Sequence, residues 1–358
     1  MKVVMTLLVR DEADIVDAQL AFHLNSGVDI VIATDNDSQD GTTEILESYE
    51  RDGYLRLLRS HAQDHSQPEI VTHMARLAAA SGADWVINSD ADEFWWPRGG
   101  SLAEILGEIP LDYGTVHASV RTFVPRPAGV EHFAERMIVR AVPHAPLFEP
   151  TSAYRPVSKV VHRAHPAIAV GAGNHSVAGG QFATLRGWYP IEVLHFPWRS
   201  AEQVTRKASI QAGSRAKMRR PPRGYEVALR SGTLDEWFAS LAVSEDALER
   251  GLAEGSLAVD TRLRDALRLV ASGPLSSSPL FARPRDGSQR LEFPTPDLVD
   301  EAAYAVDTGV LAEAEILRAQ KRLDALDERI ATLERRFVPR VMRRLRRGRP
   351  TPGGGLRT

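Results

Sequence analysis

Residues 85–97 read Trp85-Val-Ile-Asn-Ser-Asp90-Ala-Asp92-Glu93-Phe94-Trp-Trp-Pro97, and this stretch decides the fold that we expect. Its apolar start is typical of a strand buried on both faces, and its carboxylates follow where open α/β sheets bind ligands. Because side chains alternate along a strand, Asp90 and Asp92 should point the same way, with Glu93 facing away behind them. Two carboxylates directed at one point favour a bound Mg²⁺ or Mn²⁺ that could bridge to a substrate diphosphate. A plain surface turn is the alternative.

The composition excludes several classes of protein. Hydrophobic residues make up 43% and charged residues 25% of the chain, which is ordinary for a soluble globular protein of roughly two domains. The net charge of −3 argues against a nucleic-acid partner. The absence of cysteine excludes disulfides, thiolate nucleophiles and Cys-ligated zinc. Since no apolar run approaches the ~20 residues of a transmembrane helix, we expect a cytoplasmic enzyme, with a place at the inner face of the membrane as an option.

Strands and helices alternate through the stretch that precedes Asp90. The expected strands are residues 3–9, 28–34, 54–58 and 85–97, with a helix between each pair. Asp11 is expected to cap the first helix. This alternation predicts a parallel sheet with helices on both faces. Neither a G-x-G-x-x-G loop nor a Walker A lysine loop is present, so a metal could hold a diphosphate in their place.

Three motifs follow one another in this region. They are Leu7-Leu8-Val9-Arg10-Asp11-Glu12-Ala13, Thr34-Asp35-Asn36-Asp37-Ser38-Gln39-Asp40-Gly41-Thr42 and Asp90-Ala91-Asp92-Glu93-Phe94. In order and spacing they resemble the family 2-like nucleotide-sugar glycosyltransferases of the GT-A fold, which carry an opening strand with an "NE" turn, a "DNxSxDGT" segment and a "DxDEF" metal motif. The resemblance covers residues 1–97 and extends more loosely to about residue 200.

This resemblance implies an α/β fold with a GT-A-like nucleotide-binding sheet flanked by helices, followed by a helical C-terminal extension. It implies a nucleotide pocket lined by Arg10, Asp11 and Glu12, with Asp35 and Asp37 close to the base and ribose. A surface role for Arg10 and a turn role for Asp37 are the alternatives.

The metal site implied by the resemblance centres on Asp92, beside the diphosphate, with Asp90 contacting the ribose or the metal. A second block, at residues 158–165, 173–177 and 193–200, also looks like the same glycosyltransferase group. Within it, His195 ends a short apolar run, and a histidine with carboxylates suits Mn²⁺. We therefore expect Asp90, Asp92 and His195 to bind the metal, with a packed structural histidine as the alternative for His195.

The same block supplies three further candidates. His175 is expected to join Asp92 and His195 as a catalytic residue, through an acceptor contact; a loop hydrogen bond or no special role are the alternatives. Lys159 and Arg199 could neutralise the leaving diphosphate, or could lie on the surface.

We expect residues 1–200 to form the catalytic domain, followed by a helical extension and loop at 201–310. The first helix of this extension is basic, and a solvated face is favoured over a diphosphate contact from Lys207. Over 311–347, apolar residues spaced three and four apart predict a coiled-coil-like helix that could form a homodimer. Six arginines between Val338 and Pro350 suit an anionic membrane surface or a solvated tail, and residues 348–358 should be disordered.

We therefore expect a metal-dependent glycosyltransferase. It would move a sugar from a nucleotide-diphospho-sugar, a UDP-sugar being favoured, to a hydroxyl of a carbohydrate or lipid-linked acceptor, in glycan or cell-surface polysaccharide synthesis. One alternative is a noncatalytic nucleotide-binding or membrane-peripheral scaffold that dimerises through the C-terminal helix. Another is a nucleotidyltransferase, which should carry a Gly-rich loop after the first strand, where this chain has Arg10-Asp-Glu-Ala instead.

Overall fold

The structure is a computed structural model that describes residues 1–60, 66–126, 131–143, 154–180, 182–217, 224–275, 279–284 and 291–347, without the side chains of 211–217 and 334–347. It divides into two units, Met1–Leu311 and Ala312–Thr358. The predicted disorder of residues 348–358 and the membrane contact of the C-terminal arginine side chains lie outside the described residues. Across the described part of the chain, no helix has the length and apolar character needed to cross a membrane.

The first part of the chain alternates strands and helices as predicted. In order, the elements are β1 (Val3–Val9), α1 (Val16–Leu24), β2 (Ile30–Asp35), α2 (Thr42–Arg51), β3 (Leu55–Arg59), α3 (Gln67–Ala80), β4 (Trp85–Ser89), β5 (Glu93–Pro97) and α4 (Leu102–Gly107). β1 pairs in parallel with both β2 and β4, and β2 pairs in parallel with β3. The predicted parallel sheet is therefore confirmed for these four strands.

The later elements extend this sheet. They are β6 (Tyr113–Thr122), α5 (Phe133–Arg136), β7 (Val139–Ala141), β8 (Ser158–Arg163), β9 (Ala169–Val170), η1 (Ala172–Asn174), β10 (Val177–Ala178), β11 (Ala183–Leu185), β12 (Ile191–His195), α6 (Ala201–Lys217), α7 (Gly224–Ser231), α8 (Leu234–Leu241), α9 (Glu245–Ala253), β13 (Leu257–Val259), α10 (Arg262–Val270) and α11 (Leu298–Arg347).

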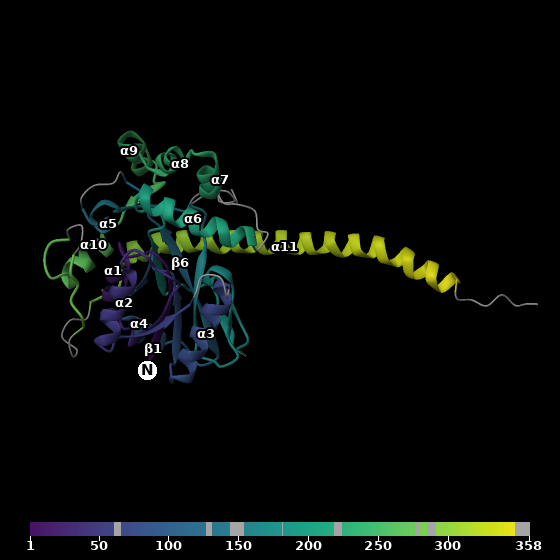
Figure 1. The fold of residues 1–358 in the computed structure, drawn as a ribbon, viewed down its shortest axis with the longest axis horizontal. Coiled ribbons are helices and arrows are strands. Elements are labelled where there is room, and N and C mark those ends of the chain that lie inside the picture. Colours follow the sequence, from purple (N-terminus) through teal and green to yellow (C-terminus); the bar gives the residue numbers. More distant parts are fainter. Residues whose placement is uncertain are drawn as a thin grey trace, which may run out of the picture. The chain divides into compact units, whose positions relative to one another are not determined.

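The complete sheet is mixed rather than parallel. Its strand order is β3-β2-β1-β4-β8-β6-β12-β5, with β11 paired to β6. β8 runs antiparallel to both β4 and β6, and β12 runs parallel to β6 but antiparallel to β5. The predicted α/β class is thus confirmed, as a mixed sheet flanked by helices with a C-terminal helical extension, which is consistent with a GT-A-like fold (Figure 1).

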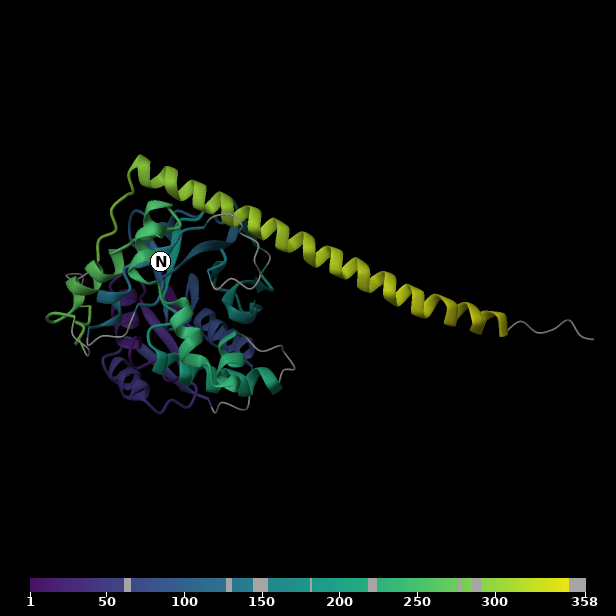
Figure 2. The same ribbon diagram turned by 90° about the horizontal axis from the view of Figure 1, so that it is seen from above.

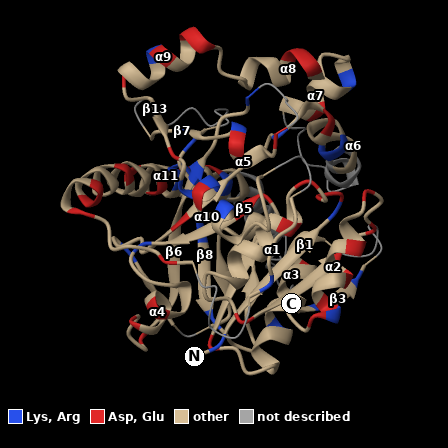
Figure 3. Cartoon of the chain, turned by 90° about the vertical axis from the view of Figure 1, so that its left-hand side faces the viewer, with Lys and Arg blue, Asp and Glu red and all other residues tan. Residues whose placement is uncertain are grey.

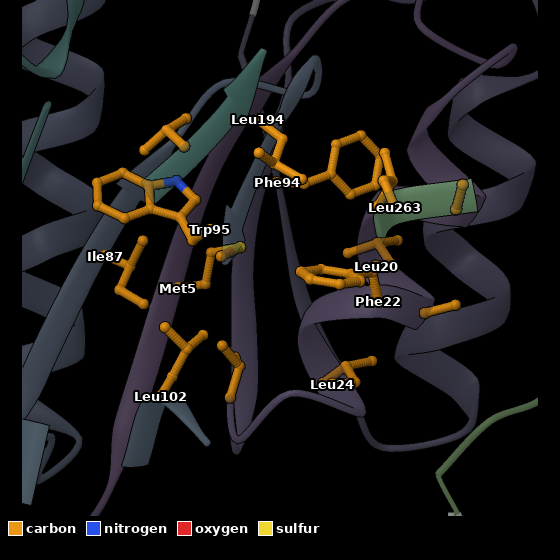
Figure 4. Packing of buried hydrophobic residues seen from close by; sticks show 14 of the residues in the cluster. Met5, Leu20, Phe22, Leu24, Ile87, Phe94, Trp95, Leu102, Leu194 and Leu263 are labelled. Carbon is orange, nitrogen blue, oxygen red and sulfur yellow. The ribbon is translucent and has the colours of Figure 1, made fainter. Parts of the chain in front are cut away.

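Alternate side chains of β1 enter two separate cores. Val4 packs with Met74 of α3 on one face of the sheet, and Met5 packs with Phe22 of α1 on the other. Figure 4 shows Met5 and Phe22 together with Trp95, which is fully buried. Because β1 is apolar at both parities, it can be covered by helices on both faces, as its sequence indicated.

The prediction of one continuous strand over residues 85–97 was wrong. β4 ends at Ser89, and the chain turns at Asp90–Asp92 before β5 begins at Glu93 on the far side of the sheet, next to β12. The Glu93 N–H donates to the Asp90 carbonyl (3.2 Å), and the Glu93 carboxylate accepts from the Asp90 N–H (3.2 Å). The alternation of side chains along a strand therefore does not apply here, and Glu93 does not face away from Asp92.

The predicted helix cap at Asp11 was also wrong. α1 begins only after Ile15, which forms no side-chain cap. Asp11 has a positive φ of 54°, and its carboxylate accepts a hydrogen bond from the Gln39 N–H (2.7 Å). Asp11 therefore ties the loop after β1 to the loop after β2.

Candidate active site

The expected site residues gather at one edge of the sheet. β1, β4 and β12 all run in the same direction, so the segments after Val9, Ser89 and His195 meet at their carboxyl ends. β8 runs the opposite way, which brings its start, with Lys159, to the same edge. This edge is where open α/β sheets bind ligands.

Asp92, Glu93 and His195 form the centre of the site. Each offers one ligand atom, and these atoms all lie within 4.8 Å of one another. Backbone pairing sets this geometry, because His195 lies opposite Glu93 in the β12–β5 ladder and the Phe196 N–H donates to the Asp92 carbonyl (2.9 Å). One imidazole nitrogen and two carboxylate oxygens are a ligand set that suits Mn²⁺. These residues therefore fit a divalent metal.

Asp90 has different partners. Its carboxylate accepts from Lys159 Nζ (3.0 Å) and from the side-chain amide of Asn174 (3.3 Å). It is not a member of the three-residue group that the described residues form. The structure thus brings Asp92 and His195 together, as the sequence suggested, but with Glu93 as the third neighbour.

Two lysines neutralise these carboxylates. Lys207 Nζ lies 2.7 Å from Asp92 Oδ2, and Lys159 Nζ lies 2.6 Å from Glu93 Oε1. Burial alone would lower the pKa of each lysine, but the neighbouring carboxylates outweigh burial and raise it, so both stay charged. Lys159 is 5% exposed, which excludes the surface role that was its alternative.

Lys207 is half-buried and pairs with Asp92, which departs from the solvated face favoured for the basic segment. α6 begins two residues after Arg199 and lays one side of its first turns against the site. Val204 and Ala208 are buried on this side, and Lys207 shares it because it follows Val204 by three residues and Gln203 by four, the spacings at which helix residues are neighbours. The apolar pair at 204 and 208 was the sequence signal that could have located Lys207.

Burial and neighbouring charges shift the pKa values of three acidic groups of the site in different directions. Burial raises the pKa of Glu93 to about 7, against the opposing charge of Lys159. Burial raises the pKa of Glu12 to about 7 as well, against the charges of Arg199 and Lys207. For Asp92, burial acts in the same direction, but the charges of Lys207 and His195 outweigh it and hold its pKa well below the usual range. Asp92 is therefore the carboxylate that stays ionised.

Arg199 is buried, with 1% of its surface exposed, so the alternative that it lies on the surface is excluded as well. It forms a two-pronged ion pair with Asp14 (Nε–Oδ2 2.7 Å, Nη2–Oδ1 2.9 Å), contacts Glu12, and donates to the Phe196 carbonyl (3.1 Å). These contacts fasten the loop after β1 to the segment after β12. The sequence analysis missed Asp14, which nothing in its local pattern distinguished.

A pocket lies beside this cluster. It is lined by Arg10, Asp11, Glu12, Gln203, Arg206, Lys207 and Ile210. The three residues predicted for the nucleotide pocket are thus among its lining, and α6 supplies the opposite wall. The lining carries three cationic side chains, Arg10, Arg206 and Lys207, and two acidic ones, Asp11 and Glu12, and each cation is paired with a carboxylate.

The second acidic loop is organised internally. Asp35 accepts from the Ser38 N–H (3.0 Å) and from the Thr43 hydroxyl (2.5 Å), so both of its oxygens are used within the loop. Asp37 adopts a positive φ of 68°, as a turn residue. A turn role therefore accounts for the geometry of Asp37.

His175 lies next to Asn174 in the loop that contacts Asp90. One ring nitrogen, Nδ1, hydrogen-bonds with the Ser158 carbonyl (2.7 Å), and burial lowers the pKa of the imidazole. Of the three roles considered for His175, this contact corresponds to the loop hydrogen bond.

Comparison with known proteins gives little beyond the geometry. No protein-family model and no curated protein matches this sequence. Among solved structures, S. aureus TarS 1-349 shares 12% identity with a TM-score of 0.30, over 59% of this chain and 65% of that chain. A mycobacterial protein shares 14% identity with a TM-score of 0.29, over 62% and 76%. Glucosyl-3-phosphoglycerate synthase from Mycobacterium tuberculosis, solved with Mn²⁺ and uridine diphosphate, shares 17% identity with a TM-score of 0.24, over 35% and 44%.

This chain therefore spans less than two thirds of the length of the TarS 1-349 structure. Likenesses this low do not establish a family for it.

Proposed function

We propose that this protein is a metal-dependent glycosyltransferase that uses a nucleotide-diphospho-sugar donor, with a UDP-sugar favoured. The observation that carries the proposal is the group Asp92, Glu93 and His195, whose ligand atoms lie within 4.8 Å of one another, beside the pocket that Lys207 also lines. A divalent metal and a diphosphate need these two features side by side. The proposed acceptor is a hydroxyl of a carbohydrate or lipid-linked molecule.

The proposed metal ligands are Asp92 and His195, with Glu93 as the third ligand in place of Asp90. When bound, a metal would neutralise the negative charge that develops on the leaving diphosphate. Asp90 would then hold Lys159 in position, and through Asn174 it would also order the loop that carries His175.

Lys207 is the proposed link between the metal ligands and the donor. Its ammonium contacts Asp92, and its side chain also lines the pocket. With a cation at Asp92, the Lys207 ammonium would be free to donate to a phosphate oxygen. Arg10 and Arg206, in the same lining, would bind the rest of the diphosphate.

The donor can be identified with a thermal-shift panel of nucleoside diphosphates and nucleotide-sugars, with Mn²⁺ and with a chelator. A ligand that binds only the folded state raises the melting temperature. We expect one nucleotide to stabilise the protein in the presence of Mn²⁺, and this stabilisation to disappear in Asp92→Asn. The matched control is Asp17→Asn, which removes a partly buried, ion-paired carboxylate that contacts Tyr49 and Arg283 away from the pocket. Its nucleotide response should stay at the wild-type level.

A response to no nucleotide at millimolar concentration would contradict the proposal and favour the noncatalytic scaffold. The products formed from donor and acceptor distinguish a glycosyltransferase from a nucleotidyltransferase. Release of a nucleoside diphosphate indicates glycosyl transfer, whereas release of pyrophosphate or transfer of the nucleotidyl group indicates the alternative.

A further inference from the structure

The C-terminal unit exposes a continuous apolar stripe. Residues 312–347 belong to α11, which is one uninterrupted helix (Figure 2). On it, apolar residues spaced alternately three and four apart are all exposed, the large ones from 46% for Leu333 to 67% for Ile316: Ile316, Ala319, Leu323, Leu326, Ile330 and Leu333. Residues at this spacing share one side of a helix, as the a and d positions of a coiled coil do. A stripe of this kind requires a partner to leave water.

The charges beside the stripe identify the partner. With Ile316 at position a, the basic residues Arg322 and Arg329 occupy g positions, and the acidic residues Asp327 and Glu334 occupy e positions. The side chains of Arg322, Asp327 and Arg329 are exposed. Each g-position arginine is followed, five residues later in the sequence, by an e-position acid.

This arrangement is complementary to itself in only one orientation. In a parallel, in-register pair of helices, a g residue faces the e residue five positions later in the partner, so Arg322 would meet Asp327 of the partner subunit. In an antiparallel pair, g faces g and e faces e, which would oppose arginine to arginine and acid to acid. Ile316 and Ile330 at a, with Leu326 and Leu333 at d, follow the pattern that favours two-stranded parallel packing, whereas Leu323 at a and Ala319 at d depart from it.

We propose that residues 316–333 form a parallel, in-register coiled coil with a second copy of this chain. The partner is the same sequence because the charge pattern matches itself. A seam of about three heptads is close to the shortest that is stable, so the dimer should dissociate on dilution. The two catalytic units would then be joined at their C-terminal ends without sharing a site.

The orientation can be tested with single cysteines, because the chain has none of its own. In Leu333→Cys, a parallel dimer brings the two thiols together, whereas an antiparallel pair centred on residue 326 would hold them roughly 20 Å apart, from the 1.5 Å rise per residue. We expect mild oxidation to convert Leu333→Cys into a covalent dimer. The control, Glu328→Cys, lies on the outer side of the helix at position f and should stay monomeric on a non-reducing gel. Equal cross-linking of the two variants, or none in either, would overturn the proposal.

Charge reversal tests the pairing itself. Arg322→Glu with Arg329→Glu should shift the dimer to monomer in light scattering, at a concentration where the wild type is dimeric. Mixing this variant with Asp327→Arg/Glu334→Arg should restore dimers. The control Lys321→Glu changes the net charge at an f position and should leave the dimer intact. If reversal at g has no more effect than reversal at f, the charge pairing is wrong. All of these substitutions lie outside the pocket, so nucleotide binding should not change, and this test stands apart from that of the proposed function.

Discussion

The β5–β12 strand pair carries two buried charge clusters, one at each end, and they are built differently. At one end Glu93 faces His195, and at the other Trp96 faces Glu192. Both Glu93 and Glu192 are buried to 1% exposure or less. Figure 3 shows acidic and basic segments side by side near the α10 and β5 labels.

The Glu192 cluster is held by arginines. Glu192 is contacted by Arg98 (2.8 Å), Arg121 (2.8 Å) and Arg262 (2.9 Å). Arg121 also contacts Asp307 (2.6 Å), and Arg262 also contacts Asp260 (2.7 Å). Burial acts to raise the pKa of Glu192, but the arginine charges outweigh it and hold the pKa far below its usual range. Glu192 therefore stays ionised, and both of its carboxylate oxygens are paired with arginines.

At the other end, the carboxylates of Glu93 and Asp92 are paired with lysines instead, Lys159 and Lys207. Lysine is a compact point charge on a flexible stem, whereas arginine is a planar fork that is always charged and fits a carboxylate with two parallel bonds. A lysine can therefore leave a carboxylate to a metal ion more easily than an arginine can, and Glu93, whose partner is Lys159, has a pKa raised by burial to about 7. We therefore expect the Glu192 end to maintain the fold and the Glu93 end to be the one that can accept a metal ion.

The largest effect should follow from breaking the arginine cluster. Glu192→Gln leaves three buried or partly buried guanidinium groups without their shared carboxylate, which should lower the free energy of unfolding by about 3–5 kcal/mol. Urea unfolding measures this loss. The control Glu301→Gln removes an exposed partner of Arg98 and should cost below about 1 kcal/mol. Similar losses in the two variants would contradict a structural role for Glu192.

Replacing Lys207 should have two smaller effects in opposite directions, one on metal binding and one on nucleotide binding. Lys207→Met removes the ammonium that competes for Asp92, so Mn²⁺ alone should bind several-fold more tightly, while the nucleotide diphosphate binds more weakly. Arg206→Met is the matched variant, because Arg206 lines the same pocket but pairs with the exposed Glu202. It should weaken nucleotide binding without changing Mn²⁺ affinity. Isothermal titration calorimetry measures the Mn²⁺ affinity and the nucleotide affinity of each variant. An unchanged Mn²⁺ affinity in Lys207→Met would show that the lysine does not compete with the metal for Asp92.

The smallest expected effect is a change with pH at the Glu192 end. The pKa of Glu192 is lower in the folded protein than its ordinary value of 4.5, so its contribution is present above pH 4.5 and is lost as pH falls towards the folded value. The difference in stability between wild type and Glu192→Gln should therefore shrink by roughly 1 kcal/mol between pH 7 and pH 4. Urea titrations at both pH values test this; a difference that grows on acidification would reverse the sign of the assigned shift.

Local patterns predicted the strands and helices of the first part of the chain well. The apolar run of β1 coincides with its predicted bounds, and the ends of β4 and β12, which carry the candidate metal ligands, were identified from where apolar runs stop. The turn at Asp90–Asp92 was missed because apolar residues on both sides of it look like one strand. The contacts of Arg199 with Asp14 join positions 185 apart in sequence, and no periodicity reports such a pair. The position of Lys207 was predicted wrongly because a basic helix usually faces water, and its partner Asp92 is distant in the sequence.

The central claim is that Asp92, Glu93 and His195 bind a divalent metal, and direct titration of Mn²⁺ tests it most simply. Electron paramagnetic resonance records free Mn²⁺, so binding appears as loss of signal when protein is added. We predict saturable binding to the wild type, enhanced by the nucleotide found in the thermal-shift panel, and an affinity roughly 100-fold weaker in Asp92→Asn. Asp17→Asn should bind as the wild type does. Equal Mn²⁺ binding by wild type and Asp92→Asn would contradict the account.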